Sequence, residues 1–171
     1  MTEVYIIDAT RTPVGKRNGS LKETHPVALG ALAIRETVRR AGIDPSAIED
    51  VIMGCVSQVN EQGYNIARNA ALLAGLPIEV PATTVDRQCG SAQQAVHFAA
   101  ALIGSGACDV VVAGGIESMT RVPMGSSVTM GDPIPPELHA LYDLTNQGIA
   151  AERIAAQWGI SRAQMEALVL A

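Results

Sequence analysis

The chain has 171 residues, of which 48% are hydrophobic and 3% aromatic, and its formal net charge is −5. This length allows a sizeable core, whereas the acidic balance without a basic stripe argues against nucleic-acid binding as the main function. The apolar runs are too short for a membrane span, and the three widely spaced cysteines fit neither a disulfide framework nor a zinc site. Because the first residues show no secretory pattern, we expect a cytoplasmic protein.

The first quarter of the chain predicts a strand and a long helix. Residues 4–7 form a β-branched and aromatic run that is typical of a strand. Thr24 is suited to cap a helix that has Pro26 in its first turn and stops at Gly42. The apolar residues of this helix recur at spacings of three and four, which places them on one face: Val27, Ala31, Ile34, Val38 and Ala41.

Three further strands are predicted, in alternation with helices. A brief helical turn at residues 44–45 leads into the apolar strand 51–56, and the helix 65–74 follows. The next strand, helix and strand are predicted at 82–85, 91–103 and 110–113. The 91–103 helix contains so little charge that we expect it to be buried on most sides.

This alternation predicts an α/β fold with a parallel sheet and right-handed crossovers. In such a sheet, ligands bind beyond the carboxyl ends of the strands. Cys89 follows the third predicted strand and Glu117 follows the fourth. Both residues are therefore expected at the edge of the sheet where ligands bind.

The last quarter of the sequence has a different character. Residues 125–136 are rich in Gly, Ser and Pro, which indicates a linker or an ordered excursion. Helices are predicted at 147–158 and 161–171, the second opened by a capping box of Ser161 and Gln164. Because an apolar helix is still running at residue 171, we expect the chain to be a piece of a larger protein.

Cys89 is the main candidate for chemistry. It stands where a strand passes into a helix, and a helix N-terminus stabilises the thiolate that attacks carbonyl carbons. The small neighbours Gly90 and Ser91 leave room for a substrate carbonyl, and the backbone N–H of Cys89 is suited to donate to an oxyanion. On these residues alone, the alternative is a buried structural thiol, which is the usual fate of a lone cysteine.

The remaining titratable residues are predicted to be structural. Cys55 lies in a buried strand and Cys108 just before one, so both are expected to be core or near-core thiols. Glu117 follows two glycines, and we expect it to order its loop by accepting backbone N–H bonds, with action on substrate as the alternative. Spacing assigns no base for Cys89 among the three histidines, His25, His97 and His139.

Four segments resemble the thiolase family, in the same order and over essentially the whole chain. Residues 85–95, which read VDRQCGSAQQA and contain Cys89, resemble the nucleophile motif of thiolases. The other three are the N-terminal signature ATRTPVG at 9–15, the strand exit GGIESMT at 114–120, and AERIA at 151–155 in the helix of the inserted loop domain.

This resemblance implies a layered, thiolase-like α/β fold and an acyltransferase activity, that of an acetyl-CoA acetyltransferase or 3-ketoacyl-CoA thiolase. It assigns Cys89 as the nucleophile that attacks a 3-ketoacyl-CoA or an acyl-CoA thioester. The acyl-enzyme then passes its acyl group to coenzyme A or to an acetyl-CoA carbanion. Coenzyme A and acyl-CoA are thus substrates, and the resemblance implies no metal and no bound cofactor.

The resemblance also implies that the chain is incomplete. Residues 1–120 correspond to the first α/β domain of thiolases, and residues 121–171 to part of the inserted loop domain. The second half of thiolases supplies a G-H-P histidine that activates the nucleophile and a C-x-G-G-G cysteine that serves as acid and base. Neither motif occurs in these residues, and we therefore expect that they do not turn over alone.

One departure from the family bears on the substrate. Short-chain thiolases usually have His-Met-Gly before the loop-domain helix, where this chain has Asn146, Gln147 and Gly148. These three are candidate substrate-binding residues. Together with the GKRNG loop at 15–19, they resemble degradative thiolases of bulkier acyl chains, such as fatty acids or steroid side chains.

The resemblance finally implies a homodimer or homotetramer, in which the strand before Cys89 pairs across the dimer. Two alternatives stay open. The first is a non-catalytic subunit of thiolase fold that binds a partner chain supplying the missing half. The second is a condensing enzyme of ketosynthase type, although the motifs of that class differ from the residues around Cys89. Cleavage and condensation are equally compatible with the sequence.

Overall fold

The structure, a computed structural model, describes residues 3–171 and divides into two compact units, Met1–Met130 and Gly131–Ala171. The first unit contains α1 (Pro26–Ala41), η1 (Pro45–Ala47), β1 (Asp50–Gly54), η2 (Asn60–Gln62), α2 (Ile66–Ala74), β2 (Ala82–Val85), α3 (Ser91–Ser105), β3 (Val111–Gly115) and η3 (Ser126–Val128). The second contains α4 (Pro136–Leu141), α5 (Gln147–Trp158) and α6 (Arg162–Leu170).

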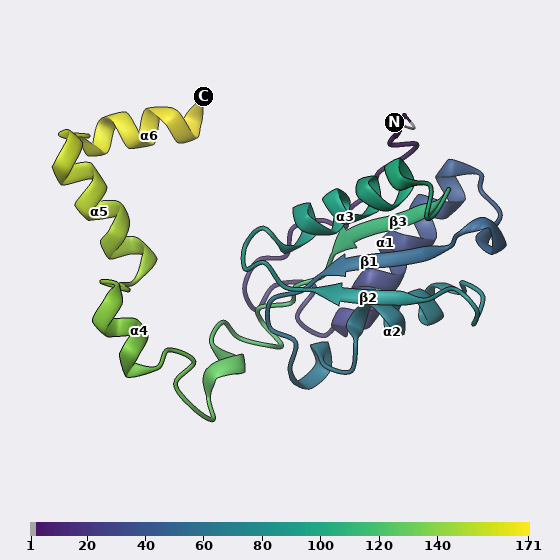
Figure 1. Cartoon of the computed structure of the whole chain (residues 1–171), viewed down its shortest axis with the longest axis horizontal. Coiled ribbons are helices and arrows are strands. Elements are labelled where there is room, and N and C mark those ends of the chain that lie inside the picture. The colour runs from purple at the N-terminus through teal and green to yellow at the C-terminus, as the bar shows by residue number, and fades with distance from the viewer. Residues whose placement is uncertain (1–2) are drawn as a thin grey trace. The chain divides into compact units, whose positions relative to one another are not determined.

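The first unit is built on a parallel three-stranded sheet in the order β2-β1-β3. Helix α2 leads outward from β1 to β2, and α3 leads back past β1 to β3. Because parallel crossovers are right-handed, connections in opposite directions place their helices on opposite faces. Accordingly, α1 and α2 cover one face and α3 covers the other (Figure 1). The α/β fold predicted from the sequence is confirmed.

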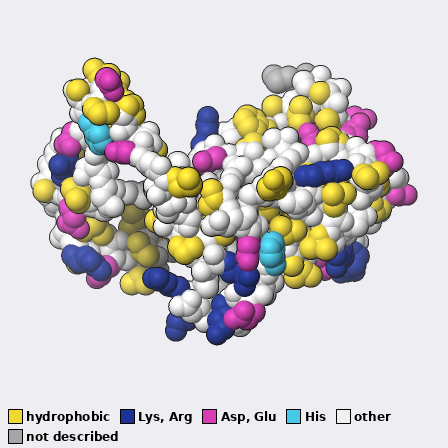
Figure 2. All heavy atoms as spheres, turned by 90° about the horizontal axis from the view of Figure 1, so that it is seen from below, with side chains coloured by type: hydrophobic (Ala, Val, Ile, Leu, Met, Phe, Trp, Pro, Cys, Tyr) yellow, Lys and Arg dark blue, Asp and Glu magenta, His cyan; other side chains and the backbone are white. Residues whose placement is uncertain are grey.

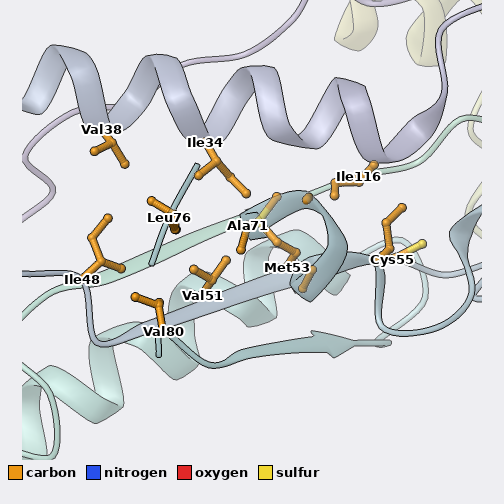
Figure 3. Close-up of a cluster of buried hydrophobic side chains, with 13 residues drawn as sticks. Ile34, Val38, Ile48, Val51, Met53, Cys55, Ala71, Leu76, Val80 and Ile116 are labelled. Carbon is orange, nitrogen blue, oxygen red and sulfur yellow. The ribbon is translucent and has the colours of Figure 1, made fainter. Parts of the chain in front are cut away.

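The core lies between the sheet and the α1–α2 layer. Successive side chains of β1 point to opposite faces, so Val51 and Met53 join this core while Gly54 faces α3. Figure 3 shows Ile34 and Val38 of α1 directed at the strands. Each buried aliphatic side chain of this kind contributes roughly 1.5–3 kcal/mol, which makes this layer the main stabilising element of the unit.

The strand predicted at residues 4–7 is absent, so this prediction was wrong. Residues 3–16 have no regular structure, and the side chains of Val4, Tyr5, Ile6 and Ile7 are 40% to 80% exposed. A cavity of about 1340 Å³ is lined by this segment, by β3 and by α1. A strand needs a neighbour for its backbone N–H and C=O groups, and within residues 3–171 this run pairs with none.

Two other predictions about helices need correction. Helix α1 is capped by His25 and not by Thr24, because the His25 Nδ1 accepts a hydrogen bond from the Val27 N–H at 3.2 Å. Helix α3 is buried along one face only, at Ser91, Ala95 and Ala99, whereas Phe98 is 45% exposed. Its charge-poor sequence predicted a helix covered on most sides, but no other helix or strand of the first unit, within residues 3–130, covers the outer side.

The second unit follows the sequence closely. Helix α5 has the predicted bounds, and α6 opens with the predicted capping box of Ser161 and Gln164. His139 lies in α4, a short helix that was not predicted. Figure 2 shows apolar side chains at the surface of each unit. No helix within residues 3–171 has the length and apolar character needed to cross a membrane.

Candidate active site

Cys89 lies in the loop between β2 and α3, at the carboxyl edge of the sheet (Figure 1), and its side chain is exposed. The preceding Gln88 has φ of 48°, in the left-handed region that side-chain-bearing residues rarely adopt. Gly90 follows as the N-cap of α3, and no side chain caps this helix. The exposed thiol therefore stands directly before an uncapped helix N-terminus, where anionic groups are stabilised.

The Cys89 loop is braced by Asp86 and Ser91. The Asp86 carboxylate accepts a hydrogen bond from the Gln88 N–H at 2.7 Å. The Ser91 hydroxyl, which is buried, accepts from the Arg87 N–H at 2.8 Å and donates to the Gln88 carbonyl at 2.5 Å. The sequence analysis did not predict either role. Aspartate does favour an Asx turn, in which its carboxylate accepts the N–H of the residue two positions later, as Asp86 does here. These bonds hold the left-handed turn that presents Cys89.

A second network joins the loops that follow β1 and β3. The Glu117 carboxylate accepts hydrogen bonds from the Val56 N–H at 2.8 Å and the Ser57 N–H at 3.4 Å. It also accepts from Nε2 of Gln62 at 2.8 Å, while Oε1 of Gln62 accepts from the Ser118 N–H at 2.7 Å. The expected loop-ordering role of Glu117 is confirmed. Gln62, which is fully buried, was not predicted.

A third connection links the same edge to the N-terminal loop. The Arg121 guanidinium forms a two-pronged ion pair with Glu61 at 2.5 and 2.6 Å and donates to the Lys22 carbonyl at 3.1 Å. This ion pair lowers the pKa of Glu61. The side chain of Arg121 thus fastens three chain segments together.

The other two cysteines differ from Cys89 in burial and charge. Cys55 is buried at the end of the core, near Ile116 (Figure 3). Burial, followed by the charges of Glu117 and Asp86, raises the pKa of Cys55 to about 12. Cys108 is partly exposed, and burial followed by the charge of Glu49 raises its pKa. The prediction that Cys55 is a core thiol is confirmed.

These differences predict the order in which the thiols react. Iodoacetamide at pH 8 is expected to label Cys89 at least about ten times faster than Cys55 in the folded chain. Only a thiolate is alkylated, and at this pH a thiol with a pKa near 12 is almost entirely protonated. Labelling of Cys55 should therefore rise only as the pH approaches 12. Peptide mass spectrometry after timed quenching measures both rates, and equal labelling in native buffer would contradict the assignment.

Two histidines and the candidate substrate residues are placed as follows. His25 caps α1, and His97 is exposed on α3. Asn146 caps α5 by accepting a hydrogen bond from the Gly148 N–H at 2.9 Å, and with Gln147 it is exposed in the second unit. A substrate-binding role for 146–148 stays a prediction. No group of three His, Cys, Asp or Glu side chains among residues 3–171 could hold a metal ion.

Comparison with known proteins adds independent information. The family model described as thiolase, N-terminal domain matches residues 4–171. The steroid 3-ketoacyl-CoA thiolase FadA6 of Mycobacterium tuberculosis is 49% identical over 97% of the chain and 43% of its own length. A 3-ketoacyl-CoA thiolase of Bacillus subtilis is 43% identical over 99% and 44%. A beta-ketoadipyl-CoA thiolase of Acinetobacter baylyi is 42% identical over 95% and 44%. The chain therefore spans less than half the length of these relatives.

Proposed function

The chain belongs to the thiolase family, whose N-terminal domain it matches over residues 4–171, and on this premise we propose that Cys89 is its acyl-accepting nucleophile. The thiolate attacks the acyl carbonyl of an acyl-CoA or 3-ketoacyl-CoA, and a thioester to Cys89 forms as CoA thiolate or the acetyl-CoA carbanion departs. In the second half-reaction, coenzyme A or an acetyl-CoA carbanion accepts the acyl group. The substrates themselves supply every group that is transferred.

The observation that carries this proposal is the placement of Cys89. It is the exposed cysteine of the chain, it follows a left-handed residue, and it precedes an uncapped helix at the carboxyl edge of a parallel sheet. A backbone N–H at this position is suited to donate to the oxyanion that develops on the attacked carbonyl. The bracing by Asp86 and Ser91 keeps that geometry fixed before substrate arrives.

We further propose that full turnover requires groups beyond these 171 residues. His25 is engaged at the start of α1, and neither the G-H-P nor the C-x-G-G-G motif is present. A base and an acid must then come from the rest of a longer chain or from a partner. Thiolysis by the 171-residue chain at a rate near that of a complete thiolase would overturn this part of the proposal.

For the substrate, we propose a bulky acyl-CoA of the fatty-acid or steroid side-chain type. The 49% identity to a steroid 3-ketoacyl-CoA thiolase supports this, as does Asn146-Gln147-Gly148 in place of His-Met-Gly. Relatives at 41–44% identity are 3-ketoacyl-CoA and beta-ketoadipyl-CoA thiolases, so the identity alone does not fix the acyl group. Thiolysis rates of the complete enzyme on acetoacetyl-CoA and on a long or branched 3-ketoacyl-CoA test the choice, and equal rates would remove its basis.

The function is tested by following the acyl group. The complete enzyme, which supplies the activating base, is mixed with acetyl-CoA, quenched in acid and digested, and the peptide containing Cys89 is searched for an acetyl group. We expect acetylation of this peptide and not of the peptides that contain Cys55 or Cys108, because Cys55 is buried and Cys108 lies beyond the far end of α3. Acetylation at another cysteine, or none at all, would count against the proposal.

A second candidate function is a non-catalytic thiolase-fold subunit that binds a partner chain. Such a subunit would obtain the second-half motifs from its partner chain. Intact mass measured in solution separates the two: a tightly bound, different chain supports the subunit, and a longer single chain supports the enzyme.

We also propose a homodimer or homotetramer in the cytoplasm, with β2 pairing across the dimer, because the outer edge of β2 pairs with no strand of the described chain.

A further inference from the structure

The first turn of α3 lies unusually close to the sheet. Gly54 and Gly115 are register partners at the carboxyl ends of β1 and β3, and both face α3. A Cβ added to Gly54 would meet backbone atoms of Ser91 and Ala92 at less than 3.0 Å. A Cβ added to Gly115 would lie 2.6 Å from the Cβ of Ala92. Both distances are far inside van der Waals contact, so this approach requires glycine at both positions.

The neighbouring glycine shows that this demand is local. Gly114 precedes Gly115 on β3, and its side-chain position faces the opposite side of the sheet. A Cβ there would meet only the end of the Met53 side chain, at 3.3 and 3.4 Å, and methionine ends move easily. Two adjacent glycines on one strand therefore differ sharply in what an added methyl group would do.

We propose that Gly54 and Gly115 are positioning residues for Cys89, a step that rests on the proposed function of that thiol. Cys89 is two residues before the turn that they support, and Ser91 within this turn bonds back to the Cys89 loop. The Gly54 carbonyl also accepts the Ile116 N–H at 2.9 Å, and the Cys55 N–H donates to the Val85 carbonyl at 3.0 Å. The two glycines thus fix the position of the start of α3 relative to the carboxyl ends of the three strands. The position of the Cys89 N–H is fixed with it.

The test is a rescue experiment in the complete enzyme, which supplies the base that activates Cys89. In G115A, the new methyl group collides with Ala92, and in G115A/A92G the colliding methyl group is removed. G114A is the matched control. Two rates at Cys89 are measured for each variant: acylation by acetyl-CoA and alkylation by iodoacetamide. Thermal unfolding followed by circular dichroism confirms that each variant is folded.

We expect acylation of G115A to be slower by on the order of 100-fold, the loss that a misplacement of about 1 Å can cause. The loss should lie in the maximal rate and not in the half-saturating acetyl-CoA concentration. Alkylation should be about two- to five-fold slower, because the helix start that presents the thiol is displaced. Both rates should recover in G115A/A92G, and G114A should match the parent chain.

Alkylation of folded G115A at the parent rate would overturn the inference, and so would a double variant that fails to recover. If the parent is alkylated but never acylated by acetyl-CoA, the proposed function fails, whereas the alkylation rates still decide the role of the glycines. G54A, whose methyl group would strike backbone, is expected to be impaired more severely than G115A and to gain nothing from A92G.

Discussion

In the complete enzyme, replacing Cys89 by serine is expected to lower the rate of acylation by acetyl-CoA by roughly 10⁴- to 10⁶-fold, the range found when a covalent nucleophile is removed. A serine hydroxyl has the same reach as the thiol, but it ionises far less readily, and a helix N-terminus cannot compensate for that difference. The measurement is the single-turnover appearance of the acetylated Cys89 peptide by mass spectrometry.

The matched control for this substitution is Cys108→Ser. Cys108 is a partly exposed thiol just after α3, more than a helix length along the chain from Cys89. Its replacement should leave acylation within about two-fold of the parent rate, because it removes a thiol without touching the Cys89 loop. Persistent acetylation of C89S, or loss of acetylation in a folded C108S, would refute the nucleophile assignment.

Replacing Gln62 by leucine is expected to lower the free energy of unfolding by about 2–4 kcal/mol. The leucine is of similar size, so packing changes little, but three hydrogen bonds disappear. The Ser118 N–H loses its partner, the Ser57 carbonyl keeps only the Val59 N–H as a donor, and the Glu117 carboxylate loses one donor. Buried groups left in this state cost more than the bonds themselves contribute.

Urea unfolding followed by circular dichroism measures this change. Gln93→Leu is a suitable control, because Gln93 is exposed on α3 and its replacement exchanges the same side chains without burying or exposing a polar group. It should alter the free energy of unfolding by no more than about 0.5 kcal/mol. A Q62L chain as stable as Q93L would show that the network contributes nothing to folding.

The sequence predicted those features that depend on local patterns. The three-and-four spacing of apolar residues located α1, and the helix-stopping Gly42 located its end. The position of Cys89 between a strand and a helix could also be predicted, because both elements have local sequence patterns. A nucleophile of this kind is defined by its immediate neighbours, and those neighbours are contiguous in the chain.

Features that depend on distant partners were not predictable in this way. Residues 4–7 have the composition of a strand, yet composition does not reveal whether a neighbouring strand is available. Gln62 looks like any polar loop residue, and only the fold brings it between Ser57, Glu117 and Ser118. The tight fit of Gly54 against α3 likewise exists only once both elements are in place.

The two outer strands of the sheet also bear on solubility. Within residues 3–171, β1 is paired on both sides, while β2 and β3 each leave one side unpaired. Pairing between two copies of β2 is isologous and closes after two chains. Pairing of β2 in one chain with β3 in the next is head-to-tail, so each addition recreates the same open strand, and unless the rotation closes a ring, growth continues into a filament. A cover over the open side of β3 would therefore also protect the protein from assembling into fibres.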